Sequence, residues 1–229
     1  MQTRAFDVVI AGGGMVGASL AVALSKLPLQ IGLIEAFPFE ASEQPAYDDR
    51  AIALSYGSAQ ILKGMGIWPE VEPVTTAIKS IHVSDRGHFG KTHIDCQEYG
   101  HDALGYVVEV NPFGRSLHQQ LTRTDVSLFC PDTVAKLEYQ SDFANITLSS
   151  GEQLSAKLVV IADGAHSQSR KLANIEFNTR AYQQAAIIAN IEVAGGHHNH
   201  AFERFTEHGP MALLPMSNNR YSLVWCMEP

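Results

Sequence analysis

A glycine pattern near the N-terminus is the part of this sequence best suited to chemistry. Gly12, Gly14 and Gly17 form a G-x-G-x-x-G pattern between an apolar run at 6–11 and a helix-forming run at 15–27. In such a pattern the first glycine permits a tight turn, the second lets the backbone approach a pyrophosphate, and the third lets helix and strand pack closely. The free N–H groups and positive dipole end of the helix would bind the phosphates. The pattern therefore predicts a dinucleotide site.

An acidic residue follows a second apolar run at 31–34. Glu35 lies close to the offset of ~20 residues from the glycines at which a carboxylate binds a ribose hydroxyl. Strand, glycine turn, helix and strand form a βαβ unit, which closes right-handed into a parallel sheet. A glycine turn without a nucleotide is the alternative, and the two strands and the acid argue against it.

A second candidate site follows the apolar run at 158–162, which we expect to be a buried strand. Asp163 and Gly164 stand at its carboxyl end, before a short polar helix that reaches Arg170. The aspartate could bind a polyol or ribose, and the glycine would leave room for the ligand. From the residues alone, an ordinary Asp-Gly turn is about equally compatible with this pattern.

The combination of the first motif with A-D-G-x-x-S-x-x-R at 162–170 resembles the flavoprotein aromatic hydroxylases, which include para-hydroxybenzoate hydroxylase. Three further segments are similar to the ubiquinone-biosynthesis hydroxylases, and most of all to the 2-octaprenyl-6-methoxyphenol hydroxylases. These segments are D-R-A-I-A-L at 49–54, V-S-D-R-G-H at 83–88, and F-E-R-F-T with H-G-P between 202 and 210. The likeness runs from Asp7 to Cys226, nearly the whole chain.

The resemblance implies FAD as the cofactor and a role for each matching residue. The glycines Gly12, Gly14 and Gly17 would hold the pyrophosphate, and Glu35 the adenosine ribose. Arg50, after a polar loop at 36–49, would lie near the flavin and its phosphates, while Asp163 and Gly164 would line the ribityl side. Arg115 would approach the cofactor, although an exposed helical arginine is more often a solvated side chain.

The implied activity is an FAD-dependent monooxygenase that hydroxylates a prenylated phenol with O2 and NADH or NADPH. No catalytic residue can be chosen from the sequence. The implied partners are other ubiquinone-synthesis proteins and a peripheral membrane contact. The alternatives are an NAD-dependent dehydrogenase and a non-catalytic truncated subunit of a quinone-synthesis complex. Family members carry a further Gly-Asp-Ala turn that this sequence lacks, so we expect a chain truncated at the C-terminus that binds FAD weakly and does not turn over.

The elements that position these motifs indicate an α/β fold. The expected architecture is a Rossmann-like FAD-binding domain of para-hydroxybenzoate hydroxylase type, at 1–75 and 97–180, with an interleaved β-sheet substrate domain at 76–96 and 181–229. Helices are expected over 55–65 and from Asn111 to Leu121, and strands over 78–84, 92–96 and 126–130. Strands at 186–193, 211–214 and 221–225 have no helices between them, which predicts an antiparallel sheet.

Bulk properties exclude several classes of protein. The 229 residues carry a formal net charge of −8, which argues against a nucleic-acid surface. Three scattered cysteines argue against a disulfide framework or zinc site and suit a reducing compartment. Glycines interrupt the apolar N-terminal stretch where a signal peptide would be strongest. We therefore expect a cytoplasmic protein with no metal, located at the inner face of the membrane.

Two groups of side chains leave alternatives open. His197, His198 and His200 fit a solvated hairpin loop better than a metal site, because no other ligands have suitable spacing. The aromatic residues of the last strands fit a hydrophobic core or, less often, a pocket for a prenyl chain. These residues are Phe202, Phe205, Tyr221 and Trp225.

Overall fold

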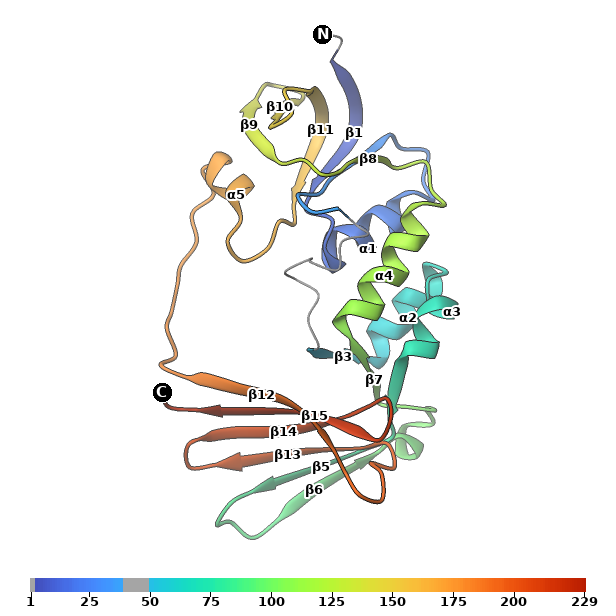
Figure 1. Ribbon diagram of the computed structural model, residues 1–229, viewed down its shortest axis with the longest axis vertical. Coiled ribbons are helices and arrows are strands. Elements are labelled where there is room, and N and C mark those ends of the chain that lie inside the picture. Colours follow the sequence, from blue (N-terminus) through green and yellow to red (C-terminus); the bar gives the residue numbers. More distant parts are fainter. Residues whose placement is uncertain (1–2, 39–49) are drawn as a thin grey trace. The chain divides into compact units, whose positions relative to one another are not determined.

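The computed structural model describes residues 3–38 and 50–229 and divides the chain into two compact units (Figure 1). The first unit comprises residues 1–46 and 114–178, and the second comprises 47–113 and 179–229. The predicted loop at 36–49 lies largely outside the described residues. The chain therefore passes between the units three times, as an interleaved architecture requires.

The first unit is built on a six-stranded sheet with the strand order β8-β2-β1-β11-β10-β9. Strands β8, β2, β1 and β11 are parallel, and β9 and β10 pair antiparallel with their neighbours. Helix α1 packs against β1 and β2, which confirms the predicted βαβ unit. The elements are β1 (Arg4–Ala11), α1 (Met15–Leu24), β2 (Ile31–Ile34), β8 (Ser127–Phe129), β9 (Val134–Tyr139), β10 (Ala144–Leu148), β11 (Gln153–Ile161) and α5 (Gln168–Leu172).

The core of the first unit lies where the parallel strands meet the β9–β10 hairpin. Val9 and Ile146 are almost fully buried there, and the rings of Phe6 and Phe129 meet edge to face with centroids 5.8 Å apart. An edge-to-face pair adds about 1 kcal/mol beyond the area that the rings bury. This packing fixes the register of β1 against β2 and β11, and so fixes the ends of those strands.

The prediction of a buried strand at 158–162 is confirmed for the strand, which β11 contains as far as Ile161, but is wrong about its burial. Leu158 is 56% exposed, and Val159 to Ile161 are only partly buried, whereas Leu154 and Ala156 earlier in β11 are buried. The physical reason is that the helices of this unit pack mainly on other strands than β11. Helix α1 packs on β1 and β2, and helix α5 packs on β9. An apolar run by itself does not show whether a helix covers it.

The second unit contains a six-stranded sheet with the order β12-β15-β14-β13-β5-β6. The pairs β12–β15, β15–β14 and β14–β13 are antiparallel, which confirms the predicted antiparallel sheet, but β13 and β5 are parallel. Parallel pairing arises here because the two strands come from different passages of the chain through this unit. The strands are β5 (Ser80–Asp85), β6 (Lys91–Asp95), β12 (Ala185–Glu192), β13 (His200–Thr206), β14 (Gly209–Met216) and β15 (Arg220–Met227).

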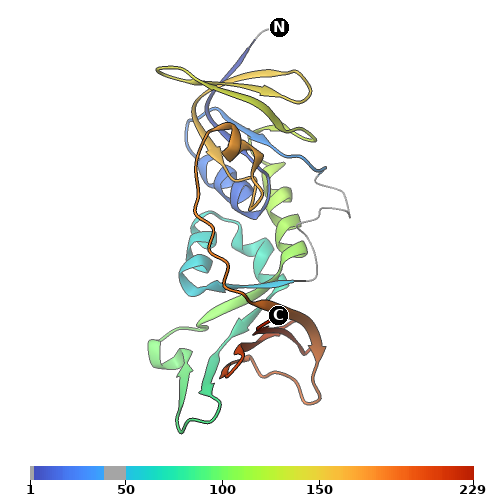
Figure 2. The same ribbon diagram turned by 90° about the vertical axis from the view of Figure 1, so that its left-hand side faces the viewer.

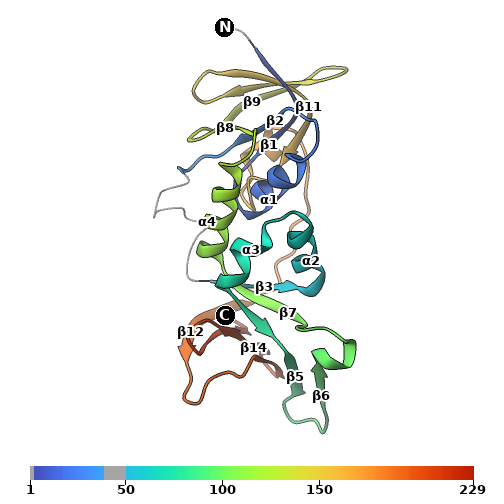
Figure 3. The same cartoon turned by 90° about the vertical axis from the view of Figure 1, so that its right-hand side faces the viewer.

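A three-stranded sheet, β3-β7-β4, completes the second unit beside helices α2 and α3 (Figure 3). Its elements are β3 (Ala51–Ser55), α2 (Tyr56–Gly64), α3 (Trp68–Val71), η1 (Glu72–Val74), β4 (Thr75–Ile78), η2 (Cys96–Tyr99) and β7 (Gly105–Glu109). Ile78 and Val107 of this sheet share a small core with Ala201 and Met216 of the larger sheet. This core explains why residues 47–75 and 97–113 lie in the second compact unit. We assigned these residues to the FAD-binding domain, and that assignment stays a prediction.

Helix α4 (Val110–Leu121) begins in the second unit and continues into the first, because the boundary at Gly114 falls inside it. The helix confirms the prediction made from Asn111 and Pro112. At the last crossing between the units, residues 173–184 run without helix or strand from α5 to β12 (Figure 2). No helix among residues 3–38 and 50–229 is long and apolar enough to span a membrane.

Two predictions about local structure need correction. The strand predicted over 78–84 is divided at Lys79, where the chain leaves the small sheet at Ile78 and enters the large one at Ser80. The histidine cluster does not form a hairpin loop, because β12 and β13 are separated by β15 and β14, and His200 already belongs to β13. Strand partners depend on contacts distant in sequence, which alternation of apolar residues does not specify.

Candidate functional site

Three strand ends of the first unit meet at the predicted dinucleotide site. The backbone N–H of Gly12 donates to the Ile34 carbonyl at 2.8 Å, and the N–H of Ala162 donates to the Ala11 carbonyl at 2.7 Å. These bonds continue the ladders that join β1 to β2 and to β11. Consequently the glycine turn, Glu35 and Asp163 come together at the carboxyl edge of the parallel sheet, where ligands bind in folds of this class.

The three motif glycines meet different steric conditions. Gly12 has φ +103°, and a Cβ on it would lie 2.6 Å from the Ala162 carbonyl carbon and 2.7 Å from Asp163 Cα. A Cβ on Gly17 would overlap the Gly12 carbonyl oxygen. Two of the glycines therefore serve the close packing of the turn against β11 and α1.

Gly14 is the exception, because a Cβ built on it would meet nothing within 4 Å. Its φ of −64° is open to any residue, and it stands at the N-cap of α1 without a side-chain cap. Open space beside a helix N-terminus suits a phosphate, which N–H groups and the helix dipole stabilise. The residues present fit a dinucleotide pyrophosphate at this position.

Glu35 is held in place by the backbone around it. The side chain is only 9% exposed; its Oε2 accepts from the Gly13 N–H at 2.5 Å, and its Oε1 accepts from the Phe37 N–H at 2.9 Å. A carboxylate has about four acceptor positions, so each oxygen can still accept from a ribose hydroxyl. Sequence reasoning did not foresee that Glu35 also organises the glycine turn.

His118 is a residue at this site that sequence reasoning missed. It lies on α4, is only 7% exposed, and its Nε2 is 3.2 Å from the Gly13 carbonyl oxygen. The one signal in the sequence was the place of His118 beside Leu117 and near Leu121, on the apolar side of a strongly amphipathic helix. That position predicts a buried side chain, but it does not predict a contact with the glycine turn.

The Asp163 loop is closed by its own serines. The Ser167 hydroxyl donates to Asp163 Oδ1, and the Ser169 N–H donates to Asp163 Oδ2 at 2.9 Å. The Ser167 oxygen also accepts from the Arg170 N–H at 2.9 Å, so it caps α5. Gly164 has φ +87° and open space around it. The motif A-D-G-x-x-S-x-x-R thus builds a rigid turn that presents Asp163.

The hydrogen bonds of this loop set the charge state of Asp163. Burial by itself raises the pKa of the carboxyl, but the hydrogen bonds from Ser167 and Ser169 outweigh burial and hold the pKa below its ordinary value. The carboxylate is therefore charged at neutral pH.

This lowered pKa predicts an acid-dependent stability. A carboxyl whose folded pKa is depressed stabilises the fold above its unfolded pKa, near 4, and loses that contribution as pH falls through the folded value. Asp163→Asn is expected to lower the free energy of unfolding at pH 7, with a difference from the parent that shrinks below about pH 4. Urea unfolding at pH 7 and pH 3 measures this, with the exposed Asp142→Asn as control. An equal difference at both pH values would show that Asp163 acts through shape alone.

The two predicted arginines come from other segments of the chain. Arg50 precedes β3 in the second unit, where its carbonyl accepts from the Val110 N–H at 3.0 Å. Arg115 is exposed on the part of α4 that belongs to the first unit. The structure thus brings together Gly12, Gly14, Gly17, Glu35, Asp163 and Gly164, while the approach of both arginines to a cofactor stays a prediction.

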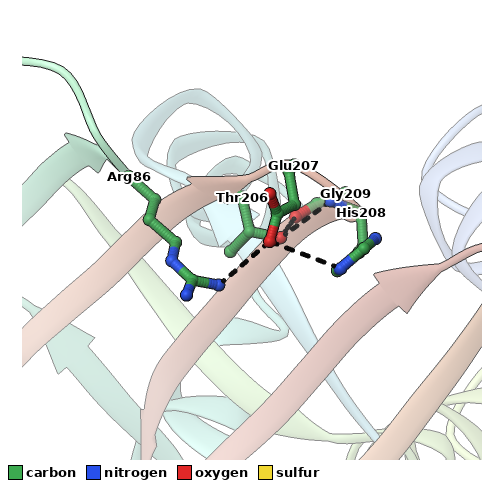
Figure 4. Close-up of polar contacts among 5 residues, drawn as sticks. All are labelled: Arg86, Thr206, Glu207, His208 and Gly209. Carbon is green, nitrogen blue, oxygen red and sulfur yellow. Dashed lines mark hydrogen bonds and ion pairs between the residues drawn. The ribbon is translucent and has the colours of Figure 1, made fainter.

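Two of the motifs that carried the resemblance meet at one end of the large sheet. The Arg86 N–H donates to the Phe205 carbonyl at 3.0 Å. The Arg86 guanidinium lies 3.4 Å from Glu207 Oε1, and His208 lies 3.5 Å from the same oxygen (Figure 4). All three side chains are exposed, so these pairs add well under 1 kcal/mol each. The two turns lie side by side because β5 and β13 pair in parallel as far as Asp85 and Phe205.

The aromatic residues of the large sheet are divided between its two faces. By strand register, Phe202, Tyr221 and Trp225 share one face and Phe205 lies on the other. Tyr221 is buried, whereas Phe202 is 38% and Phe205 48% exposed. The prediction of a core position is therefore confirmed for Tyr221 and wrong for Phe202 and Phe205.

Comparison with known proteins identifies the family of this chain. A family model described as FAD binding domain matches residues 5–229. The chain is 35% identical to the ubiquinone hydroxylase UbiL of Rhodospirillum rubrum, covering 96% of this chain and 51% of that protein. It is 32% identical to the 3-demethoxyubiquinol 3-hydroxylase of Escherichia coli, covering all of this chain and 59% of that protein.

Solved structures show the same fold at low identity. The p-nitrophenol 4-monooxygenase PnpA of Pseudomonas putida matches the whole chain and 59% of its own length with a TM-score of 0.81 at 17% identity. The chain spans little more than half the length of the relatives that it matches. The match over nearly every residue, with the glycine turn, Glu35 and the Asp163 loop at one sheet edge, leads to one conclusion: this chain belongs to the FAD binding domain family, within which it is similar to the ubiquinone-biosynthesis hydroxylases.

Proposed function

We propose that the protein containing this chain is an FAD-dependent monooxygenase that hydroxylates a prenylated phenol in ubiquinone biosynthesis. The observation that carries the proposal is the meeting of the glycine turn, Glu35 and the Asp163 loop at one edge of the sheet. The named activities of the relatives from Rhodospirillum rubrum and Escherichia coli support the reaction type. Within the group we propose a 2-octaprenyl-6-methoxyphenol as substrate, which rests on the motifs at 83–88 and 202–210.

The proposed roles follow from the geometry of the first unit. The pyrophosphate would lie in the open space beside Gly14, at the N-terminus of α1. Gly12 and Gly17 would contribute by letting the turn pack closely against β11 and α1. Glu35 would accept from the adenosine ribose, and Asp163 with Gly164 would line the ribityl chain. Arg50 and Arg115 would add positive charge near the phosphates. When bound, FAD supplies the activation of O2 with electrons from NADH or NADPH.

The second unit would supply an apolar environment for the phenol and its prenyl chain. Phe202, Tyr221 and Trp225 lie on one face of its large sheet, and we propose that this face contributes to a prenyl pocket. An apolar lining excludes water, which would otherwise divert the oxidation into release of hydrogen peroxide. The protein's contribution is therefore to bind and orient the ring and to keep the site dry.

Two measurements test the proposal in order. The first is the visible absorbance spectrum of the purified chain after addition of FAD and gel filtration, where a retained flavin spectrum is expected if these motifs suffice. The second is oxidation of NADH or NADPH by the full-length protein with and without a prenylated phenol. Oxidation that depends on the phenol and yields a hydroxylated product supports the proposal. Reduction of NAD by a substrate without any bound flavin would replace it with a dehydrogenase.

A peripheral membrane contact is the further part of this proposal, and the hairpin between β5 and β6 supports it. Phe89 at its tip is fully exposed, between Gly87 and Gly90, which both have positive φ, and next to exposed Lys91. An exposed aromatic ring with a neighbouring cation suits the boundary between lipid headgroups and acyl chains. Such a contact would give a cytoplasmic protein access to a prenylated substrate.

The expected result is that Phe89→Ala weakens partitioning onto phosphatidylcholine–phosphatidylglycerol vesicles about tenfold, because transfer of one ring from water is lost. Cosedimentation at fixed lipid concentration measures it. The matched control is Phe143→Ala, which removes a partly exposed phenylalanine at the β9–β10 turn beside Asp142 and should leave partitioning unchanged. Equal partitioning of the parent and the Phe89 variant would remove the hairpin from the membrane contact.

A further inference from the structure

Both polar backbone groups of Gly13, the central glycine of the turn, are bound by side chains from other elements. Its N–H donates to Glu35 Oε2 at the end of β2, at 2.5 Å. Its carbonyl oxygen lies 3.2 Å from His118 Nε2 on α4, and both contacts are buried. The residue is therefore held from two sides by groups far apart in the sequence.

The direction of the second bond is fixed by chemistry. A carbonyl oxygen can only accept, so Nε2 of His118 must carry the hydrogen. Both the Nε2–H tautomer and the protonated ring meet this condition. His118 thus acts on Gly13 as a donor, and this bond helps to hold its ring.

Holding the Gly13 carbonyl also sets the direction of the next N–H group. The peptide bond between Gly13 and Gly14 is planar and trans, so its C=O and N–H point in opposite directions. With the carbonyl held by His118, the N–H of Gly14 points away from that contact. Gly14 caps α1 and borders the open space described above.

We propose that His118 is a positioning residue for the cofactor: by holding the Gly13 carbonyl, it orients the Gly14 N–H toward the pyrophosphate of FAD. The inference rests on the proposed placement of the pyrophosphate beside Gly14. The predicted effect is on the affinity for the phosphate groups of the ligand, because the glycine turn stands at the N-terminus of α1, where the phosphates would bind. A residue that only filled space between α4 and the turn would affect stability and would not distinguish phosphate-bearing ligands from others.

Three substitutions separate hydrogen bonding from space filling. His118→Gln places an amide N–H close to the position of Nε2 and keeps the donor. His118→Asn has the same chemistry, but its amide reaches only the position of Nδ1. His118→Phe keeps an aromatic ring of similar size without any donor. Thermal unfolding of the ligand-free variants measures what each change does to packing.

The experiment is titration calorimetry of each variant with ADP and with adenosine. We expect His118→Phe and His118→Asn to weaken ADP binding about five- to tenfold, the value of one buried hydrogen bond. His118→Gln should stay within about twofold of the parent by the same reasoning. Adenosine lacks phosphates, so its affinity should be the same in all four proteins.

Each outcome supports or overturns a distinct claim. ADP affinity in His118→Phe equal to that of the parent, or equal losses for ADP and adenosine, overturns the positioning role and leaves the FAD site standing. If the parent chain binds neither FAD nor ADP, the placement of the site is overturned, and the role of His118 with it. Nitrogen NMR of the ligand-free chain gives an independent check, because a neutral His118 protonated at Nδ1 contradicts the hydrogen bond.

Discussion

Gly12→Ala is expected to lower the free energy of unfolding by about 2–5 kcal/mol and to abolish retention of FAD. One part of the cost is the backbone, because φ is +103° and a side chain there adds about 1–2 kcal/mol. The other part is steric, since the new Cβ would lie 2.6 Å from the Ala162 carbonyl carbon, and overpacking adds about 1–3 kcal/mol. Denaturant unfolding and the absorbance of flavin retained after gel filtration measure the two effects.

Gly14→Ala is the matched control, because the same methyl group enters open space at an ordinary φ. We expect a change in the free energy of unfolding below about 1 kcal/mol, the usual cost of alanine at an N-cap. FAD binding should weaken even so, because the methyl group occupies the space assigned to the pyrophosphate. A Gly14 variant that retains FAD as well as the parent does would place the pyrophosphate elsewhere.

Glu35→Ala is expected to cost about 2–3 kcal/mol of stability, since it removes the charged acceptor of two backbone N–H groups in a buried position. Loss of the ribose contact and of the ordered Gly13 should weaken FAD binding about 100-fold or more. Chemical unfolding of the ligand-free chain and flavin fluorescence titration measure these separately.

The control for Glu35 is Glu152→Ala, which removes a 42%-exposed carboxylate paired with Arg4 at 3.4 Å. That change should cost below about 0.5 kcal/mol and leave FAD binding unaltered. Glu35→Gln should fall between the parent and Glu35→Ala, because one of its two oxygens is replaced by an amide donor that faces a backbone N–H. If Glu35→Ala were as stable as Glu152→Ala, the carboxylate would not organise the turn.

Local patterns in the sequence were enough to predict the βαβ unit, the glycine turn and the family. These features depend on residues that are neighbours in the chain: an apolar run, glycines at fixed spacing, helix-forming residues and an acid after the next run. The resemblance carried by residues 83–88 and 202–210 could likewise be recognised from the sequence. The contact between these segments through Arg86 and Glu207 could not be predicted from it. Local patterns identify elements, and a familiar set of elements identifies a fold.

How those elements meet became clear from the three-dimensional fold. It divided the strand at 78–84 between two sheets, paired β13 with β5, and left Leu158 exposed. It also placed Asp163 against Gly12 and brought His118 to the carbonyl of Gly13, over a separation of 105 residues. The physical reason is that register and packing between distant segments depend on which surfaces cover one another, and no local spacing encodes that.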